Sequence, residues 1–152
     1  MKLITLIAVF ICAAAQVPAQ SLNKDYDSVL AKKLNADAYG MRKYYLVILK
    51  TGTAGITDKA RLDSIFAGHM KNIVSLASQN KLLVAGPLGK NDNNYRGIFI
   101  LNTESKAEAE KMVEADPAVQ MKVLAADLYL WNGSAALQEL PEIDKKIAKE
   151  NF

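Results

Sequence analysis

His69 is the single histidine of this chain, and it interrupts an apolar pattern. Together with Leu62, Phe66, Ile73 and Leu76 it recurs at steps of three and four residues, which predicts the inward stripe of an amphipathic helix. An imidazole exchanges a proton near neutral pH, so His69 is a candidate general acid or base. The spacing leaves one alternative open, a buried and hydrogen-bonded core histidine.

Asp116 is the candidate partner of this histidine. It precedes Pro117, and an Asp before a Pro is typical of a helix cap followed by the first helical position. If the fold brings Asp116 to His69, the carboxylate would orient the ring and fix its tautomer. A pure capping role is the alternative.

Gly86 and Arg96 are the candidate ligand contacts. Gly86 begins the run Gly-Pro-Leu-Gly, which either shapes a pocket rim with free backbone N–H groups or forms a simple turn. Arg96 either contacts an anionic group or pairs with Asp92 at the surface. Asp127 lies inside an apolar strand, where a lone carboxylate is costly unless it is paired or faces solvent at an edge.

The elements that carry these residues alternate in a regular order. The composition predicts strands and helices in the order β-α-β-β-α-β, with strands over 44–50, 82–85, 95–101 and 123–131 and helices over 57–79 and 105–115. This order is that of an α+β, ferredoxin-like protomer with an antiparallel sheet and both helices on one face. Several strands are apolar on both faces, so we predict a homodimer in which two sheets pack together.

The two ends of the chain lie outside this pattern. Lys2, an uncharged apolar run and the small residues around Ala19 predict a signal peptide over 1–19 with a cut after Ala19. A lipoprotein signal at Cys12 is the rival interpretation. We therefore expect a secreted or periplasmic protein with no membrane span after signal cleavage.

The remaining terminal segments are short. Residues 20–43 are predicted to form an N-terminal helical extension, 44–131 the main domain, and 132–152 a C-terminal tail.

Composition narrows the classes of partner and cofactor. The chain has 19 basic and 16 acidic residues, and loss of Lys2 with the signal leaves 18 and 16, a net charge near +2. Without a basic stripe we expect no nucleic-acid partner. The mature chain has no cysteine and one histidine, so we expect no disulfide, no metal site and no cofactor.

A resemblance gives these observations a context. The runs FAGHMKNIVSLASQNKLLVAGPLG, YRGIFIL and EADPAV resemble the YciI-like family (YCII-related domain) over most of the mature chain. The resemblance implies a dimeric α/β barrel of ferredoxin-like protomers and an active-site histidine with a nearby aspartate, here His69 and Asp116. Many members carry an arginine a few residues before the histidine, whereas residues 65–68 here are Ile, Phe, Ala and Gly.

The function expected from these observations is that of an exported YciI-like protein with a small-molecule pocket. His69 and Asp116 would perform cofactor-free general acid/base catalysis of the isomerase or lyase type. The alternative is a non-catalytic ligand-binding or stress-related envelope protein. A third interpretation makes the homodimer a scaffold whose contacts are the two terminal segments.

Overall fold

The computed structural model describes residues 23–149, so the expected signal peptide lies outside the described residues. Its centre is one antiparallel sheet in the order β2-β3-β1-β4. The strands are β1 (Met41–Thr51), β2 (Leu82–Pro87), β3 (Tyr95–Leu101) and β4 (Leu124–Ser134). The predicted α+β, ferredoxin-like class is confirmed, although the strands extend beyond the predicted limits.

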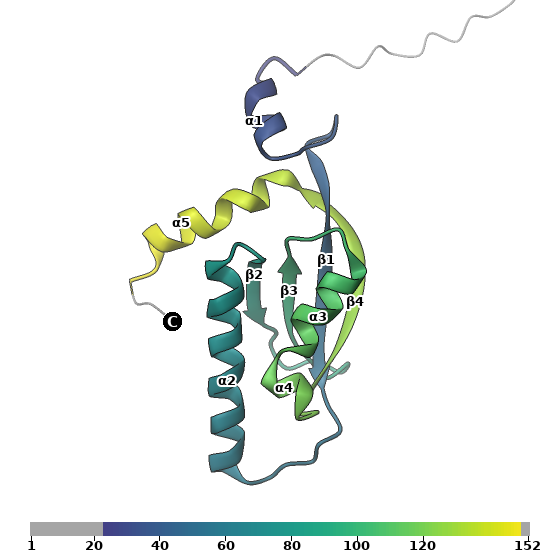
Figure 1. Cartoon of the computed structure of the whole chain (residues 1–152), viewed down its shortest axis with the longest axis vertical. Helices are drawn as coiled ribbons and strands as arrows, with labels where there is room; N and C mark the ends of the chain where they lie inside the picture. Colours follow the sequence, from purple (N-terminus) through teal and green to yellow (C-terminus); the bar gives the residue numbers. More distant parts are fainter. Residues whose placement is uncertain (1–22, 150–152) are drawn as a thin grey trace, which may run out of the picture.

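Three helices cover one face of this sheet (Figure 1). They are α2 (Lys59–Ser78), α3 (Lys106–Glu114) and the single turn α4 (Pro117–Gln120). Residues on this face form the main core, in which each fully buried aliphatic or aromatic side chain contributes about 1.5–3 kcal/mol. Its sheet members are Tyr45, Val47, Leu49, Leu82, Phe99, Leu101 and Leu124.

Local capping determines where the two main helices begin. The Asp58 carboxylate accepts a hydrogen bond from the Arg61 N–H at 2.7 Å and caps α2. Ser105 caps α3 by accepting from the Glu108 N–H at 3.3 Å. The Glu108 carboxylate accepts from the Thr103 hydroxyl at 2.6 Å, so it does not return to the cap as a full capping box requires.

The opposite face of the sheet is only partly covered. Tyr44, Leu83 and Ile100 are buried there beneath Leu137, which belongs to the 3-10 helix η1 (Ala135–Glu139). The following helix α5 (Leu140–Ile147) reaches β2, and no residue of α5 is buried. A short N-terminal helix, α1 (Ser28–Lys33), lies beyond the end of the sheet at which β1 begins (Figure 1).

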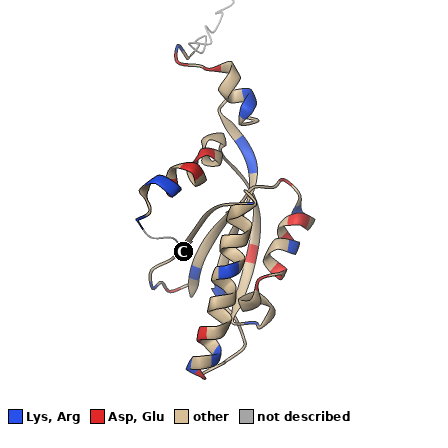
Figure 2. Cartoon of the chain, turned by 60° about the vertical axis from the view of Figure 1, so that its left-hand side comes forward, with Lys and Arg blue, Asp and Glu red and all other residues tan. Residues whose placement is uncertain are grey.

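Charges are dispersed over the described part of the chain. Lys and Arg segments are interspersed with Asp and Glu segments along the helices (Figure 2). Among the described residues, no helix combines the length and the apolar character that crossing a membrane would need.

Candidate active site at a buried histidine

His69 lies on the buried face of α2, as its spacing predicts. The residue is 8% exposed, and its ring lies between two aromatic side chains. It stacks on Phe99 of β3 with ring centroids 5.9 Å apart, and it meets Phe66 edge to face at 6.0 Å. The imidazole is therefore fixed between helix and sheet in a mostly apolar environment.

Asp116 reaches this histidine from a different element. Its Oδ2 lies 2.8 Å from His69 Nδ1, and the Asp116 side chain is almost fully buried. The two residues are 47 positions apart in the chain. The fold therefore brings together the two residues expected to form a pair.

Gly68 makes this approach possible. A Cβ atom built on Gly68 would lie 3.1 Å from Pro117 Cγ and 3.2 Å from Pro117 Cβ. The missing side chain lets α4 lie close against α2. This close approach brings Asp116, the N-cap of α4, to the imidazole. Gly68 is therefore a packing residue, since its backbone lies directly against Pro117.

The two carboxylate oxygens of Asp116 face different donors. Oδ1 accepts from the Ala118 N–H at 2.9 Å and caps α4. Oδ2 accepts from Asn72 Nδ2 at 3.1 Å as well as facing His69. Capping and pairing with histidine are thus not alternatives, because one carboxylate does both.

Asn72 is a site residue that the sequence reasoning missed. It follows His69 by three residues, so it lies on the same side of α2. The one signal in the sequence is its place one turn after the candidate catalytic histidine, within an otherwise apolar stripe.

These donors keep Asp116 ionised. Burial by itself would raise the pKa of the carboxyl group. The hydrogen bond and charge of His69, together with the hydrogen bonds from Asn72 and Ala118, outweigh burial and hold the pKa of Asp116 below its ordinary value.

An ionised Asp116 determines which ring nitrogen carries the proton. A carboxylate only accepts hydrogen bonds, so Nδ1 of His69 is the donor, and when the ring is neutral its free lone pair is on Nε2. Among the described residues Nε2 has no hydrogen-bond partner, yet it is not one of the fully buried unpartnered atoms, which are Arg42 Nε and Asn102 Oδ1. Nε2 is therefore the basic atom that the site presents.

Gly86 and Arg96 do not join this group. Gly86 pairs with Ile98 of β3, and Arg96 is two residues before Ile98 on the same strand. Because side chains alternate along a strand, Gly86 and Ile98 lie on the face opposite Phe99 and His69. Arg96 stands at a register shift between β1 and β3, outside the group around His69. Arg96 instead lines a cavity of about 320 Å³ at the turn between β2 and β3, and it makes no ion pair with Asp92 in the described part of the chain.

Asp127 is paired rather than free. It lies on the edge strand β4, and its carboxylate is 2.6 Å from the Lys50 ammonium. This pair satisfies the carboxylate that the sequence placed inside an apolar strand. Within residues 23–149, no three His, Cys, Asp or Glu side chains gather closely enough to hold a metal ion.

The chain is similar to a known protein family and to a solved structure. Residues 44–130 match the family described as YCII-related domain. Among solved structures, the chain is similar to 5-chloro-2-hydroxyhydroquinone dehydrochlorinase from Burkholderia phenoliruptrix AC1100, in complex with 2,5-dihydroxybenzoquinone. That likeness has 26% sequence identity and a TM-score of 0.41, and it covers 57% of this chain and 92% of the other. No curated protein matches the chain.

Proposed function

The chain belongs to the YCII-related domain family, and from this premise we propose that it performs cofactor-free general acid/base chemistry on a small organic molecule. One observation carries the proposal: His69 Nδ1 lies 2.8 Å from the buried, ionised Asp116, which leaves Nε2 as a base with no partner among residues 23–149. An imidazole oriented in this way is the usual means of moving a proton near neutral pH.

The proposed step is a proton transfer. Nε2 removes a proton from a carbon atom of the substrate, and the Asp116 carboxylate stabilises the resulting imidazolium. Return of that proton to another carbon completes an isomerisation, whereas loss of a leaving group completes an elimination. These are the isomerase and lyase classes, and neither requires electrons from a cofactor.

Solvent deuterium exchange tests this step without knowledge of the substrate. Small enolisable molecules (2-oxo acids, lactones and cyclic enones) are incubated with the protein in D₂O and followed by proton NMR. Abstraction by Nε2 exchanges the substrate proton with solvent, so we expect deuterium to enter at the acidic carbon of at least one class. The rate should fall by about 10²–10⁴-fold in His69→Gln, which removes the base.

Arg61→Gln is the matched control, because Arg61 is exposed on the same helix. It should leave the exchange rate unchanged. Exchange that survives His69→Gln, or no exchange with any class, would contradict the proposal. If a molecule binds both wild type and His69→Gln without turnover, the non-catalytic ligand-binding alternative is correct.

We further propose that the working unit is a homodimer joined through the open face of the sheet. Leu46, Ile48 and Ile98 are only partly buried there, and Tyr129 is 50% exposed. These residues are neighbours in the sheet, since Leu46 pairs with Tyr129 and Ile48 with Ile98. A second copy offers the same apolar surface, as a two-fold interface requires.

Export is the third part of the proposal. Its support is the charged start, apolar run and small residues of positions 1–19. The intact mass of the protein recovered from cells that express the full chain should correspond to a start at Gln20. A mass that retains residues 1–19 would contradict it.

A further inference from the structure

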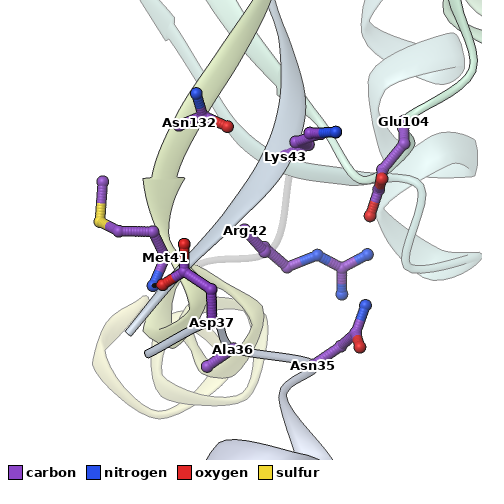
Figure 3. Close-up of a pocket in the computed structure, with 8 residues that line it drawn as sticks. All are labelled: Asn35, Ala36, Asp37, Met41, Arg42, Lys43, Glu104 and Asn132. Atoms are coloured by element: carbon purple, nitrogen blue, oxygen red, sulfur yellow. Dashed lines mark hydrogen bonds between the residues drawn. The ribbon is translucent and has the colours of Figure 1, made fainter. Parts of the chain in front are cut away.

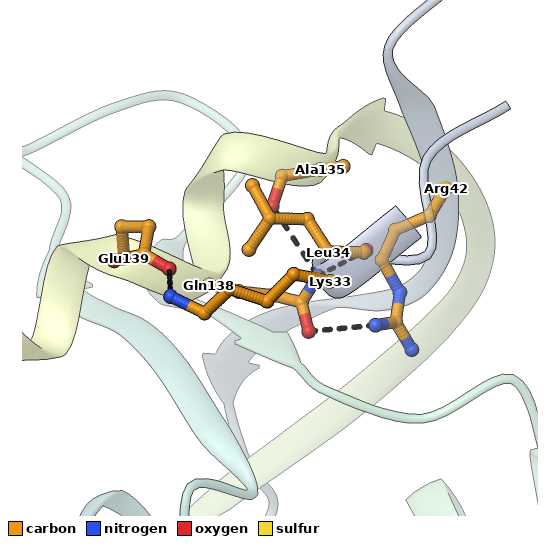
Figure 4. A network of polar contacts seen from close by, with 6 residues as sticks. All are labelled: Lys33, Leu34, Arg42, Ala135, Gln138 and Glu139. Atoms are coloured by element: carbon orange, nitrogen blue, oxygen red, sulfur yellow. Dashed lines mark hydrogen bonds and ion pairs between the residues drawn. The ribbon is translucent and has the colours of Figure 1, made fainter. Parts of the chain in front are cut away.

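The two terminal segments outside the matched domain meet each other at one end of the sheet (Figure 4). Gln138 of η1 connects them: its Nε2 donates to the Leu34 carbonyl and its Oε1 accepts from Arg42 Nη1 at 2.7 Å. Lys33 of α1 forms an ion pair with Glu139 at 2.8 Å. The extension and the tail therefore form one local structure at the start of β1.

A cavity of about 270 Å³ lies at this junction, lined by the extension, the start of β1, the loop after β3 and the end of β4 (Figure 3). This volume is at the small end of ligand pockets and suits a molecule of a few heavy atoms. None of its lining residues belongs to the group around His69, so it is a separate site.

Arg42 is the fixed cation of this cavity. Its guanidinium lies over the Tyr44 ring, 5.4 Å from the centroid, and Nη1 is held by Gln138. Its Nε atom is buried and has no partner among the described residues. Nη2 also has no partner among the described residues, but it is not one of the fully buried atoms, so Nη2 is the donor that a ligand in the cavity can reach.

Three further charged residues line the cavity. Lys43 and Glu104 border the cavity, and neither makes an ion pair or side-chain hydrogen bond within residues 23–149. In Figure 3 the Glu104 carboxylate points toward the Arg42 guanidinium from the opposite wall. The fourth charge, Asp37, already accepts the N–H groups of Tyr39 and Met41 through Oδ1, at 2.8 and 2.9 Å.

We propose that this cavity binds a small zwitterion of the α-amino acid class. The ligand carboxylate accepts a charge-assisted hydrogen bond from Arg42 Nη2, with Lys43 beside it. The ligand ammonium faces the Glu104 carboxylate. A simple anion would leave Glu104 opposed by a like charge, and a simple amine would leave Arg42 unsatisfied, whereas a zwitterion satisfies both.

The site is independent of the proposed chemistry at His69. Most of its lining residues lie on either side of the matched domain, and binding there would hold Arg42 in the position in which Gln138 already contacts it.

The test is a titration of the full chain followed by amide NMR. The probes are the twenty standard L-amino acids, with acetate and methylamine as the corresponding half-ligands, each up to about 10 mM. We expect at least one amino acid to shift the amides of Asn35, Arg42 and Asn132 saturably, with weaker binding of acetate and of methylamine. If no amino acid shifts these signals, or if acetate binds as tightly as the best amino acid, the proposal is wrong.

Variants of Arg42 and Glu104 test which of the two residues contacts the ligand carboxylate and which contacts its ammonium group. Arg42→Lys keeps the positive charge but loses the planar guanidinium that Gln138 and the Tyr44 ring hold in place, so we expect about tenfold or greater loss of amino-acid affinity. Arg61→Lys, at an exposed position of α2, is the matched control and should bind as wild type.

Glu104→Gln is a second test in case Arg42→Lys disturbs the junction, because Glu104 is exposed and its side chain makes no hydrogen bond or ion pair within the described part of the chain. The variant should lower the affinity for amino acids and should leave the affinity for acetate unchanged or higher. If Glu104 is instead only a counter-ion of Arg42, the variant will raise the affinity for acetate and for amino acids equally. That result would overturn the assignment of Glu104 to the ligand ammonium.

Discussion

At the residue scale, the chemistry of the site depends on which hydrogen-bond donors the two carboxylate oxygens of Asp116 contact. Oδ1 is committed to the Ala118 N–H, and Oδ2 is shared by His69 and Asn72. Because each oxygen accepts a hydrogen bond, one from the Ala118 N–H and one from Asn72, rotation of the carboxylate would break both. The histidine therefore always meets an acceptor, and its proton is kept on Nδ1.

Asp116→Asn should reverse the tautomer of His69. The Ala118 N–H still requires an oxygen at the Oδ1 position, so the new amide turns its NH₂ group toward the ring. Nδ1 must then accept, and the proton moves to Nε2, where it blocks the base. Nitrogen-15 NMR of the single histidine measures this directly, and any proton exchange should fall by about 10²–10⁴-fold.

The same variant also changes the response of stability to acid. The pKa of Asp116 is lower in the folded than in the unfolded chain, so the carboxylate stabilises the fold above its ordinary pKa. That contribution is lost as the pH falls through the folded-state pKa. Urea unfolding of Asp116→Asn should therefore lose less stability between neutral and acid pH than wild type does. An equal acid dependence, or an Nδ1–H ring in the variant, would contradict this account.

At the element scale, the site exists because α4 lies unusually close to α2. Gly68→Val places new carbon atoms against Pro117, where a Cβ alone is already 3.1 Å from its Cγ. We expect α4 to move away, with a loss of about 1–3 kcal/mol in the free energy of unfolding. The His69–Asp116 contact should lengthen, which nitrogen-15 NMR detects as a weakened Nδ1–H preference.

Ala67→Val is the control for this prediction. Ala67 is exposed on the same helix, so the variant carries the cost of a β-branched residue without the contact. Equal losses in the two variants would mean that helix propensity, and not the closeness of α4, explains the effect.

The sequence could predict the elements better than their contacts. Helical spacing placed His69 on the buried side of α2, and the Asp-Pro pair placed a cap at α4, because both signals are local. The pairing of His69 with Asp116 needed the resemblance, since 47 residues separate them. Arg96 was predicted to contact the ligand because it is positively charged, which the sequence shows. The place of its side chain depends on strand register, which the sequence does not show.

Asn72 and Gln138 escaped prediction for a related reason. An amide side chain has no charge and no strict spacing rule, so its role appears only when its partners are in place. Gln138 bonds to residues more than 90 positions earlier, and this contact joins the two segments that the sequence described only as an extension and a tail.

At the scale of the whole molecule, the face of the sheet opposite the helices is only partly covered within the described residues. η1 buries one end of that face through Leu137, and the Lys50–Asp127 pair lies toward the other end. Between them, Tyr129 and its neighbours form an apolar surface on the strands themselves. A second copy of the chain can cover this surface, and it would leave the helices and His69 on the outside of the joined sheets.

Tyr129→Lys tests this arrangement, because it places a charge at the centre of the proposed interface. We expect light scattering to give twice the chain mass for wild type and the single chain mass for the variant. Tyr39→Lys is the control, since Tyr39 is 78% exposed in the extension, away from the sheet face, and should remain dimeric. A wild-type protein of single mass, or dissociation of both variants, would show that the sheet face is not where two copies meet.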